Sequence, residues 1–236
     1  MRLPDPDKVP LSMVDWAHAG RLVPARYRAA ECFERIADHV GMRDLQAQLA
    51  DFTGAGAEDF GTMDPAKLLF GPGAGWISAC FVAPRPGRFS TAREGAFYVA
   101  RDLGTSIAEV KYHLEADYRR EGLLEPMDLE FRALRVTLKG AYHDIRTRSR
   151  TRAPWAAICA PDSHVGSQAF AARLREAGSP GILWLSLRRT GGECAAIFDP
   201  NTLRACRHET YLTFRWNGQE VDQVYERRIL KFGSEV

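Results

Sequence analysis

The chain has 236 residues, 45% hydrophobic and 26% charged, with a formal net charge of +2. This composition is typical of a globular protein, and the small net charge excludes a global electrostatic argument for nucleic-acid binding. No apolar run approaches the ~18 residues that a membrane helix needs. The N-terminus, MRLPDPDKVP, lacks the apolar core of a signal peptide. We therefore expect no association with a membrane.

The cysteines indicate a reduced protein without a metal centre. They are scattered and five in number: Cys32, Cys80, Cys159, Cys194 and Cys206. None forms a CxxC pair or lies at ligand spacing from a histidine, so we expect no metal site. Cys80 and Cys194 lie in apolar runs and are predicted to be small core residues. The expected location is the reducing cytoplasm.

The N-terminal third is predicted to be mainly helical. Residues 1–12 form an irregular arm interrupted by prolines, and apolar residues repeat at helical spacing between Cys32 and Val40. We expect one domain over residues 1–236, with a helical extension at 1–70 and a catalytic core at 71–236. Arg21, in the short extended segment GRLVP, has by itself the character of a solvated surface charge.

A glycine-rich segment precedes the core. GPGAG at 71–75 is predicted to be a turn, because no Gly-Lys-Ser/Thr follows it and no helix-start signal is evident. The apolar run at 76–82 is predicted to be a buried strand that leads into the next stretch.

The stretch from Gly87 to His113, GRFSTAREGAFYVARDLGTSIAEVKYH, organises the chain. It begins with a basic turn, Arg88-Phe89-Ser90. A strand is predicted at 95–100, with Tyr98 on one face, followed by a helix that Thr105 or Ser106 caps and that carries Glu109. A tyrosine at a strand end and a carboxylate on the next helix can face one cleft, which suits chemistry on a sugar or nucleotide.

The second half supplies more strands and one clear helix. Strands are predicted at 127–136 and 141–145, at 181–187 and 193–198, and at 209–216 and 222–231 around an Asn-Gly turn. The helix at 166–178 has Ser167 in its first turn, where a hydroxyl often serves as a cap. This order predicts an α+β fold with a mixed sheet. No GxGxxG follows a strand, so a Rossmann site is not supported.

RTRSRTR, at 146–152, carries four arginines. A solvated loop is the simplest interpretation, and contact with phosphates or an acidic partner is the alternative. No aromatic residue is interleaved, so a stacking platform for single strands is not indicated.

Catalytic motifs are sparse. No GxSxG is present, and His113, His143 and His164 share no motif, so each is predicted to be a surface or hydrogen-bonded histidine. Glu109 is the better candidate, because a carboxylate among apolar neighbours needs a partner or a function. The residues alone leave enzyme and non-enzyme equally open.

Three blocks of the chain, in this order, resemble the RES-domain family. They are Arg21 in GRLVP, the block at 87–113 with its basic turn, its Tyr strand and its Ala-x-Glu helix, and SQAFAARLREAG followed by GILWLSLRRTGGECAAIFDP. The resemblance runs from about Arg21 to the strand at Thr213. Leu22 stands where some members have a tyrosine, so no aromatic role is expected there.

The resemblance implies a function and a set of site residues. Members of the family are toxins of bacterial toxin–antitoxin pairs, their fold is similar to that of ADP-ribosyltransferases, and they attack the nicotinamide–ribose bond of NAD. By this resemblance Arg21, Glu109 and Ser167 are catalytic. Tyr98, Arg88 and Ser90 contact NAD, with Arg88 and Ser90 as added donors from the basic turn. No metal is implied.

Three functions follow as hypotheses. The first is an NAD-consuming toxin that uses inorganic phosphate or water as the acceptor, with a cognate antitoxin of the Xre helix-turn-helix type. The second is an ADP-ribosyltransferase that modifies a specific protein target with NAD. The third, ranked well below these, is a non-catalytic module that uses residues 146–152 to bind nucleic acid or an acidic partner.

Overall fold

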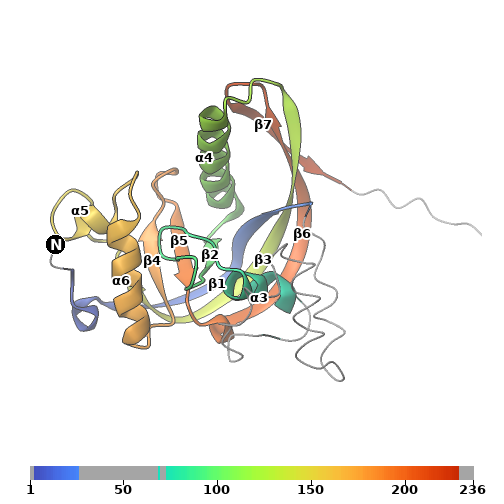
Figure 1. The fold of residues 1–236 in the computed structure, drawn as a ribbon. Coiled ribbons are helices and arrows are strands. Elements are labelled where there is room, and N and C mark those ends of the chain that lie inside the picture. Colours follow the sequence, from blue (N-terminus) through green and yellow to red (C-terminus); the bar gives the residue numbers. More distant parts are fainter. Residues whose placement is uncertain (1–2, 27–68, 70–72, 229–236) are drawn as a thin grey trace, which may run out of the picture.

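A computed structural model describes residues 3–26, 69 and 73–228. Their core is a mixed sheet with the strand order β1-β2-β5-β4-β3-β6-β7 (Figure 1). Only the β3–β4 pairing is parallel. The expected α+β class with a mixed sheet is confirmed. The helices expected between residues 27 and 68 lie outside the described residues.

The strands are long at both ends of the sheet and short in its middle. Their bounds are β1 Leu11–Pro24, β2 Phe97–Ala100, β3 Met127–Asp144, β4 Gly181–Leu185, β5 Glu193–Ile197, β6 Leu203–Trp216 and β7 Val221–Arg227. Because β1 also pairs with β3, the strands β1, β2, β5, β4 and β3 form a closed circuit of pairings. The hairpin of β6 and β7 extends the sheet beyond this circuit, on the other side of β3.

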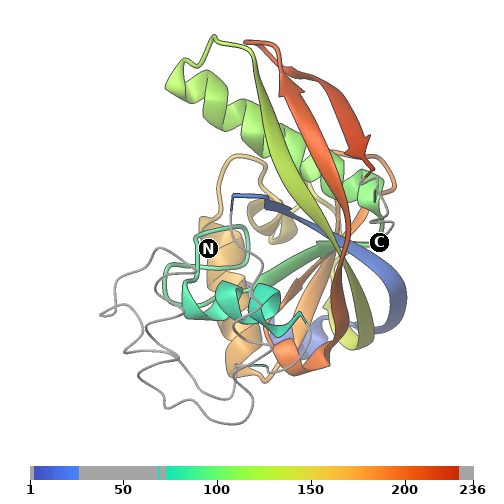
Figure 2. The same ribbon diagram turned by 90° about the vertical axis from the view of Figure 1, so that its right-hand side faces the viewer.

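The helices cover separate parts of the sheet. Their bounds are α3 Ala74–Val82, α4 Leu103–Glu121, α5 Trp155–Ile158 and α6 Val165–Glu176, and short 3-10 turns lie at Pro6–Lys8 and Pro200–Thr202. Figures 1 and 2 show α4 beside the long β3, β6 and β7 strands, and in Figure 1 α5 and α6 lie on the side of α4 away from these strands.

The helices α3, α6 and α4 each pack against the sheet through a separate apolar cluster. Within the described residues, α3 packs Ile77 and Phe81 against the strand circuit, and α6 packs Phe170 and Leu174 against the other face of β2 and β4. A third cluster joins α4 to the β3–β6–β7 arm, with Trp216 at its centre. Burial of these apolar surfaces is the main favourable term in folding, and it fixes where each helix presents its polar side chains.

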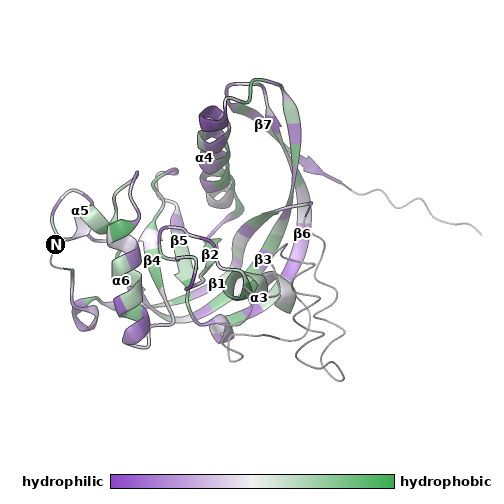
Figure 3. Cartoon of the chain, viewed as in Figure 1, coloured by the Kyte–Doolittle hydropathy of each residue, from purple (hydrophilic) through white to green (hydrophobic). Residues whose placement is uncertain are grey.

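Two N-terminal predictions were wrong. Leu11–Pro24 is a strand that pairs with β3 over most of its length, so this part of the expected extension belongs to the sheet. A register shift between Trp16 and Ala19 breaks its alternation of buried and exposed residues, and this hides the strand in the sequence. The expected strand at 76–82 is helix α3, which begins inside GPGAG and is largely hydrophobic in Figure 3. A short, continuous apolar run does not distinguish a buried strand from a buried helix.

The helix α4 starts earlier than expected. Its N-cap is Asp102, whose carboxylate accepts hydrogen bonds from the backbone N–H of Thr105 at 2.9 Å and from the Thr105 hydroxyl at 2.8 Å. Thr105 and Ser106 are therefore inside the first turn, and the expected cap at either of them was wrong. The strands predicted separately at 127–136 and 141–145 are one continuous strand, β3. The other predicted strands and the helix at 166–178 match β2, β4 to β7 and α6, with shifts at their ends.

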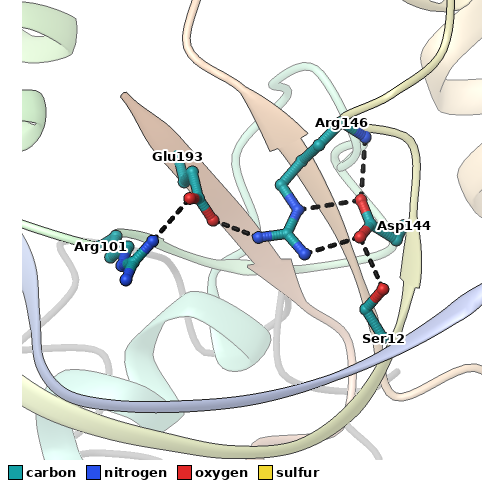
Figure 4. Close-up of polar contacts among 5 residues, drawn as sticks. All are labelled: Ser12, Arg101, Asp144, Arg146 and Glu193. Atoms are coloured by element: carbon teal, nitrogen blue, oxygen red, sulfur yellow. Dashed lines mark hydrogen bonds and ion pairs between the residues drawn. The ribbon is translucent and has the colours of Figure 1, made fainter. Parts of the chain in front are cut away.

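A network of charged residues joins the strands β1, β3 and β5 (Figure 4). Arg146 forms ion pairs with Asp144, at the end of β3, and with Glu193, at the start of β5. Arg101 also pairs with Glu193, at 2.7 Å, and the Ser12 hydroxyl of β1 donates to Asp144 at 2.7 Å. The basic stretch at 146–152 therefore begins with a structural arginine.

Candidate active site

Arg21 lies near the end of β1 and is held from several sides. Its guanidinium donates to the Tyr98 carbonyl at 3.0 Å and to the Cys80 sulfur at 3.2 Å, and it lies 4.7 Å from the centre of the Phe97 ring. Its Nε is buried and makes no hydrogen bond to the described residues. Arg21 is therefore a fixed, half-buried cation and not a solvated surface charge.

A cavity of about 390 Å³ lies beside Arg21. Its lining includes Arg21, Tyr98, Trp76 and Cys80, so β1, β2 and α3 all contribute to it. Cys80 is half-buried in this wall and does not have the fully buried core position expected for it. The cavity thus combines aromatic surface with a positive charge, as a planar or anionic ligand requires.

Tyr98 is fixed by the turn that precedes its strand. Its hydroxyl accepts a hydrogen bond from the Phe89 N–H at 2.8 Å and lies 3.0 Å from the Ser90 hydroxyl, and its ring meets Trp184 edge-on. Burial raises the pKa of Tyr98, so the phenol stays protonated at neutral pH. Tyr98 and Ser90, both expected in the site, are brought together.

Helix α6 holds the same turn in place. The Gln168 side-chain amide donates to the carbonyls of Gly87 and Ser90 at 2.9 and 3.0 Å, and the Ser90 hydroxyl donates to the Arg85 carbonyl at 2.8 Å. Arg88 points elsewhere and donates to the Ala160 carbonyl at 2.8 Å. Gln168, which sequence reasoning did not single out, is a positioning residue for the basic turn.

Glu109 projects from α4 toward the end of β4. The Ser186 hydroxyl donates to its Oε1 at 2.6 Å, and the Cys194 thiol lies 3.9 Å from the same oxygen. Ser186 in turn accepts hydrogen bonds at 3.0 Å from the backbone N–H groups of Arg188 and Arg189. The Glu109 carboxylate is thereby oriented by a hydroxyl that the 186–192 turn holds rigidly.

Close packing brings this helix up to β1. A side chain at Gly20 would place its Cβ 2.8 Å from the Ser106 hydroxyl, which donates to the Gly20 carbonyl at 2.9 Å. Only glycine permits this approach without a shift. The helix that carries Glu109 and the strand that carries Arg21 are therefore in direct contact.

Ser167 does not reach Glu109 by any hydrogen bond within the described structure. It is fully buried in the first turn of α6, where its hydroxyl donates to the His164 carbonyl at 3.0 Å. The serine that the fold brings to Glu109 is Ser186, which sequence reasoning missed. The available signal was its position, as a polar residue directly after the apolar strand GILWL and before a Gly-Gly turn.

Of the histidines predicted to be isolated, His113 lies within the electrostatic influence of Glu109, and His164 lies within that of His113. Burial lowers the pKa values of His113 and His164, so both imidazoles are mainly neutral at pH 7. The charge of Glu109 acts on His113, and the charges of Arg88 and Arg188 act on both histidines. Glu109 is therefore surrounded by cationic and titratable groups from several loops.

Three of the four arginines of residues 146–152 contact the rest of the protein through their side chains. Beyond the ion pairs of Arg146, Arg150 donates to the carbonyls of Leu185 and Ser186 at 3.1 and 3.2 Å. The Arg148 guanidinium lies over the Trp155 ring, 5.3 Å from its centre. The segment supports the turn beside Ser186, and these contacts weaken the interpretation of a free nucleic-acid surface.

The described residues contain neither a candidate metal site nor a membrane-spanning helix. In residues 3–26, 69 and 73–228, no group of three or more His, Cys, Asp or Glu side chains is placed to hold a metal ion. In the same part of the chain, no helix has the length and apolar character needed to span a bilayer.

Comparison with known families decides the relationship. The model of the RES domain matches residues 69–217. The chain belongs to the RES domain family. This match includes Tyr98, Glu109, Ser167 and Ser186, whereas Arg21 lies before it. No curated protein matches the chain.

One solved structure similar to this RES-domain chain is the crystal structure of the M. tuberculosis MbcT-MbcA toxin-antitoxin complex. The identity is 14%, the match covers 84% of this chain and 86% of the other, and the TM-score is 0.44.

Proposed function

We propose that the protein is a toxin of a toxin–antitoxin pair that cleaves the nicotinamide–ribose bond of NAD. Inorganic phosphate or water is the acceptor, and a cognate antitoxin, expected to be of the Xre type, restrains it. The observation that carries the proposal is the Glu109 carboxylate, oriented by Ser186 among cationic side chains. The helix that carries it contacts the strand of Arg21. Membership of the RES domain family supports it.

The chemistry matches these groups. When the bond from the ribose C1′ to nicotinamide breaks, its electron pair leaves with nicotinamide and positive charge develops on the ribose ring. A fixed carboxylate stabilises that charge, and Glu109 supplies it. The acceptor oxygen then bonds to C1′ and loses its proton to the medium.

The cavity beside β1 contributes binding. Arg21 presents a guanidinium whose Nε still has no hydrogen-bond acceptor among the described residues, which suits a phosphate oxygen. Tyr98 presents ring surface to the same cavity, where a flat cationic ring can stack. Arg88 adds positive charge on the side of Glu109, whose charge acts on it.

We assign the serine role to Ser186 and not to Ser167. The hydroxyls of Ser167 and Ser90 are occupied by backbone carbonyls, whereas that of Ser186 is bound to the carboxylate itself. Ser186 is a positioning residue that orients Glu109, and Ser90 positions Tyr98.

The test is a nicotinamide-release assay with purified protein freed of any partner, with and without inorganic phosphate. We expect wild-type protein and Glu121→Ala to release nicotinamide, and Glu109→Ala to lose release while remaining folded by circular dichroism. Glu121 is the matched control because it is an exposed glutamate on the same helix. An active Glu109→Ala protein would contradict the assignment. Slow release that phosphate does not stimulate would favour transfer of ADP-ribose to a protein.

A further inference from the structure

Two arginines near Glu109 have no anionic partner within the described residues. Arg88 donates only to main-chain carbonyls, those of Ala160 at 2.8 Å and Ile158 at 3.4 Å. The Arg188 guanidinium lies over the Tyr112 ring, 3.2 Å from its centre. No carboxylate of the described part of the chain forms an ion pair with either.

This lack of a partner is unusual, because both side chains are withdrawn from solvent. Both arginines are half-buried, and burial lowers the pKa of Arg88. A cation that loses part of its hydration without an anion nearby is unfavourable, so such groups are normally paired or used for binding. The adjacent Arg189 is paired with Asp102, and Arg101 and Arg146 are paired with Glu193.

The two arginines share one site with Glu109. The charges of Glu109 and Arg188 both act on Arg88, and those of Glu109, Arg88 and Arg188 all act on His113. The other carboxylates that act on this region, Asp117 and Asp102, are paired with Arg120 and Arg189. With the histidines neutral, Arg88 and Arg188 therefore leave two positive charges near the single negative charge of Glu109. A ligand that carries negative charge would remove the imbalance without displacing the carboxylate.

The side chains are also suited in shape. A guanidinium is planar and presents several N–H groups in a fixed fork that matches the oxygens of a phosphate. The Tyr112 ring restricts Arg188 to one plane, which reduces the entropy lost on binding. Arg88 is restricted by its two carbonyl acceptors, and its other guanidinium nitrogens form no hydrogen bond to any described residue.

We propose that Arg88 and Arg188 together bind a phosphate group beside Glu109, with Tyr112 holding Arg188 in place. The inference rests on the proposed function. It adds to that function the residues that bind a phosphate group of the substrate or of the acceptor. The phosphate belongs either to the pyrophosphate of the dinucleotide or to free inorganic phosphate as acceptor.

Calorimetric titration separates these sources without requiring turnover. ADP-ribose and inorganic phosphate are titrated separately into wild type, Arg88→Ala, Arg188→Ala, Tyr112→Leu and Arg215→Ala. Arg215 is the matched control because it is a half-exposed arginine on β6 whose nearest carboxylate, that of Asp128, is 3.7 Å away. Melting curves establish that each variant is folded. Because Arg88 also supports a loop, Arg188→Ala is the decisive variant.

We expect Arg88→Ala and Arg188→Ala each to weaken binding about tenfold or more, the loss of one charge-assisted hydrogen bond or two. Tyr112→Leu should have a smaller effect and Arg215→Ala none. Loss confined to ADP-ribose assigns the phosphate to the dinucleotide, and loss confined to inorganic phosphate assigns it to the acceptor. Binding of both ligands by folded Arg188→Ala within twofold of wild type would overturn the proposal.

The two proposals fail in different ways. If ADP-ribose or phosphate binds through these arginines but no nicotinamide is released, the phosphate site stands and the NAD-cleaving function is refuted. If nicotinamide is released and both arginine variants bind and turn over as wild type does, the function stands and the phosphate site is refuted.

Discussion

Two clusters of arginines and carboxylates in this protein differ in charge balance. In the first, Arg101 and Arg146 face Asp144 and Glu193, and every side chain has an oppositely charged partner (Figure 4). In the second, Arg88 and Arg188 face Glu109 without forming an ion pair to it within the described residues. The difference is in partners and not in residue types.

The comparison indicates how to separate structure from function in a protein rich in arginine. A balanced cluster joins strands and gains nothing from a ligand, because its donors and acceptors are already matched. An unbalanced cluster leaves donors unused in a site partly shielded from water, where binding of an anion is strongest. We expect substitutions in the first cluster to change stability and those in the second to change activity.

After Glu109 itself, the largest effect is expected at Ser186. Ser186→Ala removes the donor that orients Glu109 and the acceptor for two N–H groups of the 186–192 turn. We expect kcat for nicotinamide release to fall about 10²-fold, as on loss of a preorganised polar contact in other active sites. The KM for NAD should change little, and Ser186→Thr, which keeps the hydroxyl, should restore part of the activity.

Ser167→Ala is the matched control for that substitution. It deletes a buried hydroxyl that, within the described residues, donates to the His164 carbonyl, so we expect a loss of about 1 kcal/mol of stability and nearly unchanged kcat. Steady-state kinetics and thermal melts of both variants decide the matter. An inactive but folded Ser167→Ala beside an active Ser186→Ala would reverse the assignment of the two serines.

The two serines also show which features could be predicted from the sequence and which could not. The strand at Phe97–Ala100, the helix with Glu109 and the strands at 181–185 and 193–197 were predictable, because their apolar periodicity and glycine-containing turns are local signals. The bond between Glu109 and Ser186 joins positions 77 apart in the chain. No local pattern encodes such a contact.

The other discrepancies have physical causes of the same kind. α3 was predicted as a strand because a buried helix and a buried strand are both uniformly apolar. β1 was not predicted as a full strand, because its pattern of apolar and polar residues is irregular. Its stability comes from its pairing with β3, which the local sequence does not indicate. The roles of Gln168 and Arg188 depend on loops that only the folded sheet brings together.

A smaller effect, on stability alone, is expected in the balanced cluster. Arg146→Ala leaves the carboxylates of Asp144 and Glu193 facing each other without their shared cation. We expect a loss of about 1–3 kcal/mol, the cost of polar groups left unsatisfied. For a chain of this size that corresponds to a fall in Tm of about 2–4 °C per kcal/mol.

Activity measured well below the melting temperature should remain close to wild type in Arg146→Ala. The double variant Arg146→Ala/Glu193→Ala should lose less stability than the sum of the two single variants, because the two side chains share one ion pair that each single variant already removes. A large loss of kcat in a folded Arg146→Ala protein would show that the balanced cluster is part of the active site, and the contrast between the clusters would fail.

The smallest effect is expected in the response to acid, at Asp144. Burial alone would raise the pKa of this carboxyl group, but hydrogen bonds from Arg146 and Ser12 outweigh burial and hold its pKa below the ordinary value. A carboxyl whose pKa is lower in the folded than in the unfolded state stabilises the fold above the unfolded pKa of about 3.9. That contribution is lost as the pH falls through the folded pKa.

Asp144→Asn removes this titration while keeping the shape of the side chain. We therefore expect the variant to melt below wild type near pH 7 and the difference in Tm to shrink as the pH falls below about 4. Melting curves between pH 7 and pH 2 measure it, with Asp128→Asn as a control, since Asp128 is half-exposed and 3.7 Å from its arginine. A difference that stays constant over the whole range would mean that Asp144 binds protons equally in both states. The Arg146 pair would then contribute no pH-dependent stability, and the balanced cluster would hold the strands by geometry alone.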